Sequence, residues 1–192
     1  YDHETGTSIR QGGIAAVLDE HDTIKEHVAD TLGSGDGLCD RSVVESVVSS
    51  GRDRVDDLIK YGVNFVFDEK TGKLDLGKEG GHSRRRVAHS FDLTGREIER
   101  ALLEKVKRSD NIVLLEEHVA VDLLVKKDND GGNVCFGAYV MSGLKKVEPY
   151  TAKVTVLCTG GAGKVYLYTS NPDIATGDGV AMASRAGAKV SC

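Results

Sequence analysis

The chain has 192 residues, of which 40% are hydrophobic and 29% are charged, the balance of an ordinary globular protein. Its net charge of −5 gives no reason to expect nucleic acid as a partner, because the basic residues gather in one local cluster. No apolar run reaches the roughly 18–20 residues of a membrane span and no signal peptide is recognisable, so we expect no membrane association. The cysteines are far apart without paired metal spacing, which indicates reduced thiols of a cytoplasmic protein: Cys39, Cys135, Cys158 and Cys192.

Helical periodicity predicts several helices in the first part of the chain. Residues 22–32 form the first, with Gly33 as its stop signal, and Thr94 and Glu97 have capping-box spacing at the start of a strong helix. The predicted helices are 22–32, 40–50 (capped by Asp40), 53–61 (ended by Gly62) and 94–107.

Strand-like patterns alternate with these helices and continue after them. An Asn-Asp-Gly-Gly turn at 129–132 predicts a hairpin between two strands, and the apolar run 154–158 next to a glycine cluster predicts a buried strand. The predicted strands are 63–67, 73–76, 112–115, 120–125, 134–141 and 154–158, and residues 179–186 are predicted to form a last helix. This alternation indicates an α/β fold.

Both ends of the sequence read as cut. Tyr1 is not an initiator methionine, and the last residues stop where a strand begins. We therefore expect the chain to be a piece of a longer protein, with a catalytic site that the cut could divide.

The densest chemical feature lies at residues 78–86, Lys-Glu-Gly-Gly-His-Ser-Arg-Arg-Arg. The two glycines permit a tight turn or a close approach to a ligand. A carboxylate, Glu79, lies beside a cationic cluster that suits a dicarboxylic substrate or a phosphate. The alternative is a solvated basic surface turn.

Three glycine-containing segments are candidate cofactor contacts. Thr159-Gly160-Gly161 follows the predicted buried strand, where exposed backbone lets a ligand come close. Free amides and hydroxyls alternate in Gly6-Thr7-Ser8 and Gln11-Gly12-Gly13, which suits a diphosphate. Asp178 lies between glycines at a helix start, where an N-cap is the default role and a ligand hydroxyl is the alternative. No G-x-G-x-x-G follows a strand, so the dinucleotide fingerprint is missing or lies upstream of Tyr1.

In order and spacing, these segments resemble the L-aspartate oxidase branch of the succinate dehydrogenase/fumarate reductase flavoprotein family. The resemblance covers almost the whole chain. Residues 159–188 mark the wider family, and residues 79–86 and 94–99 mark the aspartate oxidase branch more closely; residues 11–17 and 118–123 complete the set.

The resemblance implies that residues 1–192 are an incomplete, Rossmann-like FAD-binding domain of the fumarate reductase flavoprotein type. Its first βαβ unit would lie upstream of Tyr1, and the capping and C-terminal helical domains beyond Cys192. By the same resemblance, the backbone of Val119 would hold the adenine end of FAD and Asp178 would hydrogen-bond on the FAD side. The implied flavin and diphosphate contacts are Gly6, Thr7, Ser8, Gln11, Gly12, Gly13, Thr159, Gly160 and Gly161.

The implied activity is oxidation of L-aspartate to iminoaspartate with oxygen or fumarate as acceptor, the first step of NAD (quinolinate) biosynthesis, with quinolinate synthase as a possible downstream partner. Glu79 corresponds to the family's active-site carboxylate, which orients the substrate amino group; succinate offers no such cation. Covalently flavinylated members carry a histidine where this chain has Gly6, so noncovalent FAD is expected. The carboxylate-binding arginine and histidine would fall beyond Cys192, and we assign no role to Arg84, Arg85 or Arg86, for which structural pairing is the expectation.

Two alternatives stay open at this stage. One is a fumarate reductase or succinate-oxidising relative, against which the presence of Glu79 argues. The other is an inactive fragment that binds FAD poorly or not at all.

Overall fold

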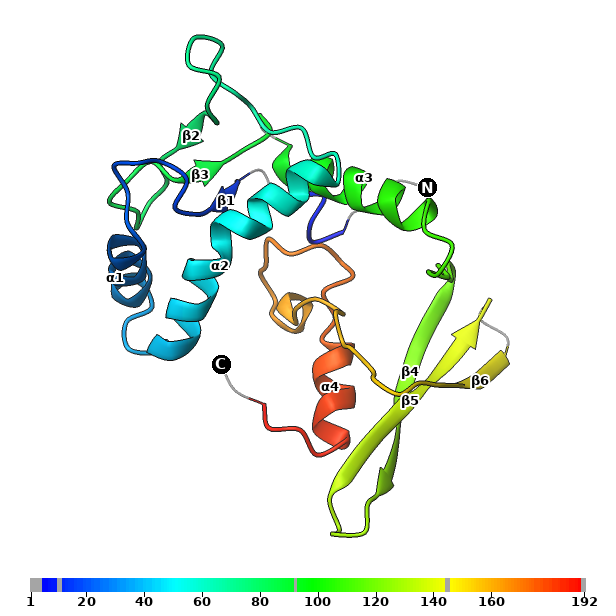
Figure 1. The fold of residues 1–192 in the computed structure, drawn as a ribbon. Helices are drawn as coiled ribbons and strands as arrows, with labels where there is room; N and C mark the ends of the chain where they lie inside the picture. Colours follow the sequence, from blue (N-terminus) through cyan, green and yellow to red (C-terminus); the bar gives the residue numbers. More distant parts are fainter. Residues whose placement is uncertain (1–4, 10–11, 92, 144–145, 191–192) are drawn as a thin grey trace. The chain divides into compact units, whose positions relative to one another are not determined.

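The computed structural model describes residues 5–9, 12–91, 93–143 and 146–190, which fall into two compact units, Tyr1–Ile112 and Val113–Cys192 (Figure 1). In the first unit two helices lie between short strands. Its elements are β1 (Ile14–Ala15), α1 (Ile24–Ser34), α2 (Arg41–Lys60), β2 (Leu76–Gly77), β3 (Val87–Ala88) and α3 (Thr94–Lys107). The three strands pair antiparallel in the order β1-β3-β2.

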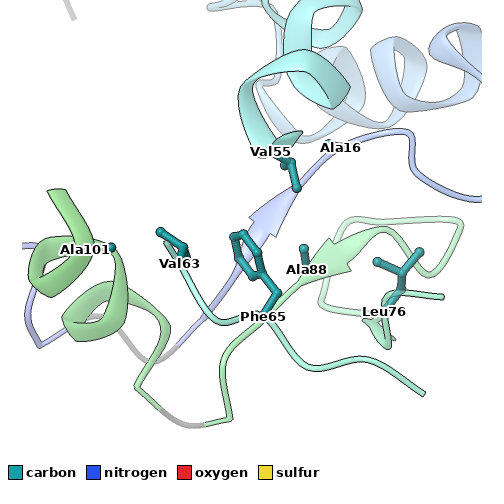
Figure 2. Packing of buried hydrophobic residues seen from close by; sticks show 7 residues of the cluster. All are labelled: Ala16, Val55, Val63, Phe65, Leu76, Ala88 and Ala101. Carbon is teal, nitrogen blue, oxygen red and sulfur yellow. The ribbon is translucent and has the colours of Figure 1, made fainter. Parts of the chain in front are cut away.

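The core of the first unit lies where α2, α3 and this small sheet meet. Val55 of α2 and Ala101 of α3 are almost fully buried, and Phe65 lies among them in an extended segment (Figure 2). The cluster comprises Ala16, Val55, Val63, Phe65, Leu76, Ala88 and Ala101. Burial of this apolar area is what holds the short strands in place, since two-residue strands alone are marginal.

The second unit is built on a long antiparallel hairpin. Strand β4 (His118–Lys127) pairs with β5 (Asn133–Ser142), and β5 pairs with β6 (Lys146–Thr151), in the order β4-β5-β6 (Figure 1). A 3₁₀ turn, η1 (Gly163–Val165), and helix α4 (Asp178–Arg185) follow. The predicted hairpin is confirmed, and β6 was not predicted. Its Pro149 fits an edge strand, where a missing N–H breaks no central ladder.

The helices at 40–50 and 53–61 are one continuous helix, so that prediction is wrong. Gly51 lies inside α2, and a Cβ added there would lie 3.2 Å from the Cβ of Ala16. The glycine is therefore a packing residue that lets the helix approach the buried Ala16, and it does not end the helix.

The predicted capping box at Thr94 and Glu97 is also wrong. The N-cap of α3 is Leu93, without a side-chain cap, and the Thr94 hydroxyl instead accepts the Ser90 N–H at 2.9 Å. Glu97 accepts hydrogen bonds from Arg100 and Asn64, which lower its pKa to about 2. The same Thr-x-x-Glu spacing does cap a helix at Thr23, whose hydroxyl accepts the Glu26 N–H at the start of α1.

Three of the predicted strands do not form as regular strands, and a fourth, 73–76, contributes only a bridge at Leu74 and the residue Leu76, where β2 begins. Residues 63–67 contribute only an isolated bridge from Phe67 to Leu74, and residues 112–115 and 154–158 are irregular. Val113, Val154 and Val156 are each 75–80% exposed. A buried strand needs hydrogen-bonded neighbours on both sides; Val66 in the first segment bonds to His89 and Asp75, but the described residues place no such neighbours beside 112–115 and 154–158. Among the residues that the structure describes, no helix is both long enough and apolar enough to cross a membrane.

Candidate cofactor and substrate site

Glu79 lies beside the glycine segment at the start of the chain. A Cβ built on Gly12 would lie 3.3 Å from Oε1 of Glu79. Both residues are exposed, so neither is needed to fill the core. The structure therefore brings the predicted catalytic carboxylate next to a predicted cofactor-binding glycine, although nearly seventy residues separate them in sequence.

Gly13 has a packing reason of its own. A Cβ at this position would collide with the carbonyl oxygen of Ala88 and with the Val87 side chain, because β1 begins at the next residue and pairs with β3. Any side chain here would push the strand away from its partner. Gly13 thus sets the exit of the glycine segment into the sheet, while Gln11 lies outside the described residues.

The segment before it forms a closed turn. The Thr5 N–H donates to Oγ of Ser8 at 2.8 Å, and the Ser8 N–H donates to Oγ1 of Thr5 at 2.9 Å. The Thr5 hydroxyl in turn donates to Glu99 of α3 at 2.5 Å. The Ser8 hydroxyl is therefore engaged inside the turn, whereas Gly6 and Thr7 are exposed at its tip. Of the predicted segment Gly6-Thr7-Ser8, only Gly6 and Thr7 are therefore exposed to a ligand.

Arg86, at the other end of the Glu79 segment, is completely buried. Its Nε and Nη2 donate to the two carboxylate oxygens of Asp22, each at 2.8 Å, and its Nη1 donates to Asp30 at 2.7 Å. The side chains of Arg86 and Asp22 are 0% and 1% exposed. A bidentate, doubly paired guanidinium of this kind is a structural anchor, as the sequence led us to expect, and it is not available to a substrate.

Asp30 of α1 holds the middle of the same segment. One of its oxygens accepts from the Ser83 N–H and the Ser83 hydroxyl, each at 2.8 Å, as well as from Arg86. Burial alone would raise the pKa of Asp30, but the hydrogen bonds from Ser83 and Arg86 outweigh it and lower the pKa to about 2. Arg84 adds an exposed ion pair with Glu26 at 2.7 Å.

Two histidines lie beside this network. The rings of His27 on α1 and His82 meet edge to face, with centroids 5.7 Å apart. Burial and the nearby Arg86 guanidinium lower the pKa of His27, so it is neutral at physiological pH. The neutral ring adds no second positive charge beside Arg86.

In the second unit, two predicted glycine segments meet. A Cβ on Gly179 of α4 would collide with Oγ1 of Thr159, and a Cβ on Gly177 would lie 2.9 Å from the Cβ of Ala162. The Lys164 N–H donates to the Ala175 carbonyl at 2.9 Å. The bare backbone of Gly160 and Gly161 is consequently held next to the start of α4.

Asp178 is the first residue of α4 and not its N-cap, which corrects the default reading. The N-cap is Gly177, in a left-handed conformation (φ 81°) that glycine adopts without strain. The Asp178 carboxylate instead accepts from the Thr176 hydroxyl at 2.7 Å and is exposed. Val119 lies on β4, opposite Met141 in the ladder, with its side chain 46% exposed.

The residues that the sequence did not reveal are those that hold the candidate segments in place. Asp22 and Asp30 lie 64 and 56 residues from Arg86, and Glu99 lies 94 residues from Thr5. No local spacing rule links such distant positions. Only the excess of arginines at 84–86 indicated that acidic partners had to exist.

The chemistry of the exposed donors fits parts of a flavin dinucleotide. Gly160 and Gly161 have no neighbouring atom within 4 Å of where a Cβ would be, so a ligand can approach their backbone closely. They lie next to the N-terminal end of α4, whose unpaired N–H groups favour anionic or polar ligand edges. In the first unit, the exposed Gly6, Thr7 and Gly12 offer backbone of the same kind.

Comparisons with known proteins agree with this assignment. Among curated proteins, the chain is 46% identical over 190 residues to L-aspartate oxidase 2-b, chloroplastic, of Nicotiana tabacum, covering 98% of this chain and 29% of that protein. It is 49% identical over 184 residues to L-aspartate oxidase 1 of Ralstonia nicotianae, covering 94% of this chain and 34% of the relative. The chain thus spans about a third of the length of the curated relatives it matches.

Solved structures give the same fold. A quinol fumarate reductase from E. coli superposes with a TM-score of 0.85 at 29% identity, covering 93% of this chain and 30% of that one. The Sdh1 complex of Mycobacterium smegmatis superposes with a TM-score of 0.83 at 31% identity, covering 95% and 32%. The predicted fold class, a partial FAD-binding domain of the fumarate reductase flavoprotein type, is confirmed.

A family match gives the cofactor. Residues 3–192 match the FAD binding domain family, which makes FAD the cofactor of this fold. On this match, and with L-aspartate oxidases and fumarate reductase flavoproteins among its relatives, the chain belongs to the FAD binding domain family.

Proposed function

We propose that this chain is the FAD-binding part of an enzyme that oxidises L-aspartate to iminoaspartate. The observation that carries the proposal is the exposed Glu79 carboxylate beside Gly12, in a chain whose curated relatives at 43–49% identity are L-aspartate oxidases. When bound, FAD would supply the hydride acceptor for C2 of the substrate and deliver the electrons to oxygen or fumarate.

Glu79 is the residue of this chain that we assign to the substrate. A carboxylate on an exposed turn favours an ammonium group, and L-aspartate carries one where succinate does not. Arg84 and Arg86 are engaged by Glu26, Asp22 and Asp30, so we do not assign the two substrate carboxylates to them. Glu79 would therefore orient the amino end of the substrate and set the preference for it.

The remaining predicted residues are assigned to FAD. Gly6, Thr7 and Gly12 offer exposed backbone to the flavin and diphosphate in the first unit, and Ser8 and Gln11 complete that segment. Thr159, Gly160 and Gly161, with Asp178 on α4, would line the cofactor in the second unit, and Val119 would hold the adenine end through its backbone. The cofactor is expected to be noncovalent, since Gly6 carries no side chain that could form a bond to it.

The product fits a place at the start of NAD biosynthesis, with quinolinate synthase as the consumer of iminoaspartate. We keep the cytoplasm as the expected compartment, although relatives from plants are chloroplastic. The second candidate is a fumarate reductase or succinate-oxidising flavoprotein, which the solved structures at 29–31% identity favour.

An anaerobic titration of the full-length protein separates these functions. The visible spectrum is recorded before and after addition of L-aspartate, and separately of succinate. Bleaching of the flavin by aspartate alone is the expected result. If succinate bleaches the flavin and aspartate does not, the second candidate replaces the proposal. If the protein takes up no FAD, both functions are excluded.

A further inference from the structure

The segment that carries Glu79 is fastened to helix α1, and this attachment has no role in the function proposed so far. The segment connects β2 to β3. At its base the Arg86 N–H donates to the Gly77 carbonyl at 3.1 Å. In its middle, Ser83 donates twice to Asp30, and at its end Arg86 donates to Asp30 and Asp22. One carboxylate, that of Asp30, therefore joins both the middle and the end of the segment.

The attachment is tight, and it is buried at its Arg86 end. A Cβ on Gly81 would lie 2.8 Å from Oγ of Ser34, at the C-terminal end of α1, so the backbone passes directly over the helix. Gly81 itself is left-handed, with φ 82°, which favours glycine at this turn. The Asp30 side chain is 17% exposed and that of Arg86 is fully buried, so water competes little for the bonds of Arg86, whereas the Ser83 bonds are more exposed.

The Glu79 side chain itself is exposed, and within the described residues it accepts no hydrogen bond. Its backbone carbonyl accepts the His82 N–H at 3.3 Å, which links it to the fastened part of the segment. The position of the carboxylate beside Gly12 is therefore set by the backbone of the segment, and the segment is set by α1. A displacement of about 1 Å in such a group is enough to weaken a charged contact that depends on orientation.

We propose that Asp30 is a positioning residue for Glu79. Through Glu79 it sets the enzyme's preference for an amino-bearing dicarboxylate over the same dicarboxylate without an amino group. The inference rests on the proposed function. Asp30 touches neither substrate nor cofactor; it acts through Ser83 and Arg86. Its loss weakens recognition of the ammonium group while leaving recognition of the two substrate carboxylates intact.

The test compares two ligands that differ only in the amino group. In the full-length holoenzyme with Asp30→Asn, the KM for L-aspartate is measured from initial rates, and the Kd for succinate from the perturbation of the flavin absorbance. We expect the KM for aspartate to rise by about tenfold and the Kd for succinate to stay within about twofold. Hydrogen exchange of the 78–86 peptide should be faster than in the wild type, with the peptides of β4 and β5 unchanged.

Matched variants are compared by the ratio of the KM for aspartate to the Kd for succinate. Glu79→Gln should raise this ratio at least as much as Asp30→Asn. Glu20→Gln, which removes an exposed pair with Lys73, should change neither the KM nor the Kd. Ser83→Ala removes one donor to Asp30 and should shift the ratio in the same direction by a few-fold, which keeps the test open if Asp30→Asn folds poorly.

Two results would overturn the inference about Asp30, and a third would contradict the proposed role of Glu79, on which the inference rests. If Glu79→Gln changes the ratio and neither Asp30→Asn nor Ser83→Ala does, Asp30 does not position Glu79. If Asp30→Asn weakens both ligands equally, its role is only structural. If Glu79→Gln itself leaves the ratio unchanged, the proposed role of Glu79 fails, independently of Asp30.

Discussion

A buried cluster in the first unit and the irregular segments of the second use similar apolar residues with opposite results. In the first unit, Val55, Ala16 and Ala88 are fully buried against one another. In the second, Val154 and Val156 are each 75% exposed, and Leu167 and Tyr168 are 88% and 89% exposed. The residue types hardly differ, so the difference lies in whether another described element supplies a partner surface.

Charged residues show the same contrast. Arg86 of the first unit is enclosed with Asp22 and Asp30, whereas Arg185 of α4 meets Asp122 of β4 with 54% and 40% of their side chains exposed. A buried pair cannot lose one member without leaving a charge out of water, while an exposed pair is replaced by solvent. The first unit therefore concentrates its stability in a few enclosed contacts, and predictions can test this directly.

The largest expected effect follows from removing the enclosed guanidinium. Arg86→Met should destabilise the first unit by about 3–5 kcal/mol, because Asp22 stays buried without its partner. Arg84→Met, on the same segment but in an exposed pair, should cost far less stability, because solvent replaces the lost partner. Hydrogen exchange in urea, followed separately on peptides of α1 and of β5, measures each unit. If the two variants lose similar amounts of stability, the contrast between enclosed and exposed ion pairs is wrong.

A pair of leucines compares the packing of the two units. Leu76 belongs to the core of the first unit and Leu124 lies in β4, and both are more than nine-tenths buried. Each leucine lines a hollow, of about 380 Å³ for Leu76 and about 230 Å³ for Leu124, but Leu76 alone packs within the cluster of buried apolar residues, so its removal costs more contacts. We expect Leu76→Ala to destabilise its unit by about 3 kcal/mol and Leu124→Ala by about 1–2 kcal/mol. Urea unfolding monitored by unit-specific exchange decides the order, and the reverse order would show that the second unit packs more tightly than its exposure indicates.

Acid should weaken the first unit more than the second. The folded pKa of Asp30, about 2, lies below the ordinary value of 3.8, so the ionised form stabilises the fold. This contribution is complete above about pH 4 and is lost as the pH falls towards 2, a change of about 2 kcal/mol. Comparing wild type and Asp30→Asn at pH 5 and pH 2.5 should show a stability difference that shrinks in acid. Asp122 also has a lowered pKa, from its bond with Arg185, but it is exposed and should contribute less.

Prediction from sequence succeeded where the determining contacts were local. Helices α1, α3 and α4 and the β4–β5 hairpin follow from periodicity and turn residues within each segment. The region 40–61 was misread as two helices because what places Gly51 inside one helix is its contact with Ala16, more than thirty residues away. The run at 154–158 was misread as a strand because its apolar pattern is that of a strand, while the neighbours that would complete one are not among the described residues.

The candidate site divides in the same way. Glu79 and the glycine segments were singled out by their residue types, and their resemblance to a family supplied the roles expected of them. Their mutual placement is partly visible: Glu79 lies beside Gly12, and Thr159 lies beside Gly179. The acidic partners of Arg86 were not found, because neither Asp30 of α1 nor Asp22, which precedes that helix, belongs to a recognisable motif.

The smallest expected effect tests the irregular segment itself. Residues 154–157 keep the alternation of a strand: Thr155 and Leu157 line a hollow of about 450 Å³ with Cys135 and α4, whereas Val154 and Val156 are largely exposed. Val156→Thr keeps the shape and adds a hydroxyl, so in the 192-residue chain it should change the stability of the second unit by less than about 0.5 kcal/mol. The same change at the buried Val55 should destabilise the first unit by more than about 1 kcal/mol, because the hydroxyl there would lack a partner. If Val156→Thr proves as harmful as Val55→Thr, the segment is packed in solution, and the exposure that separates the two units is not a property of the folded chain.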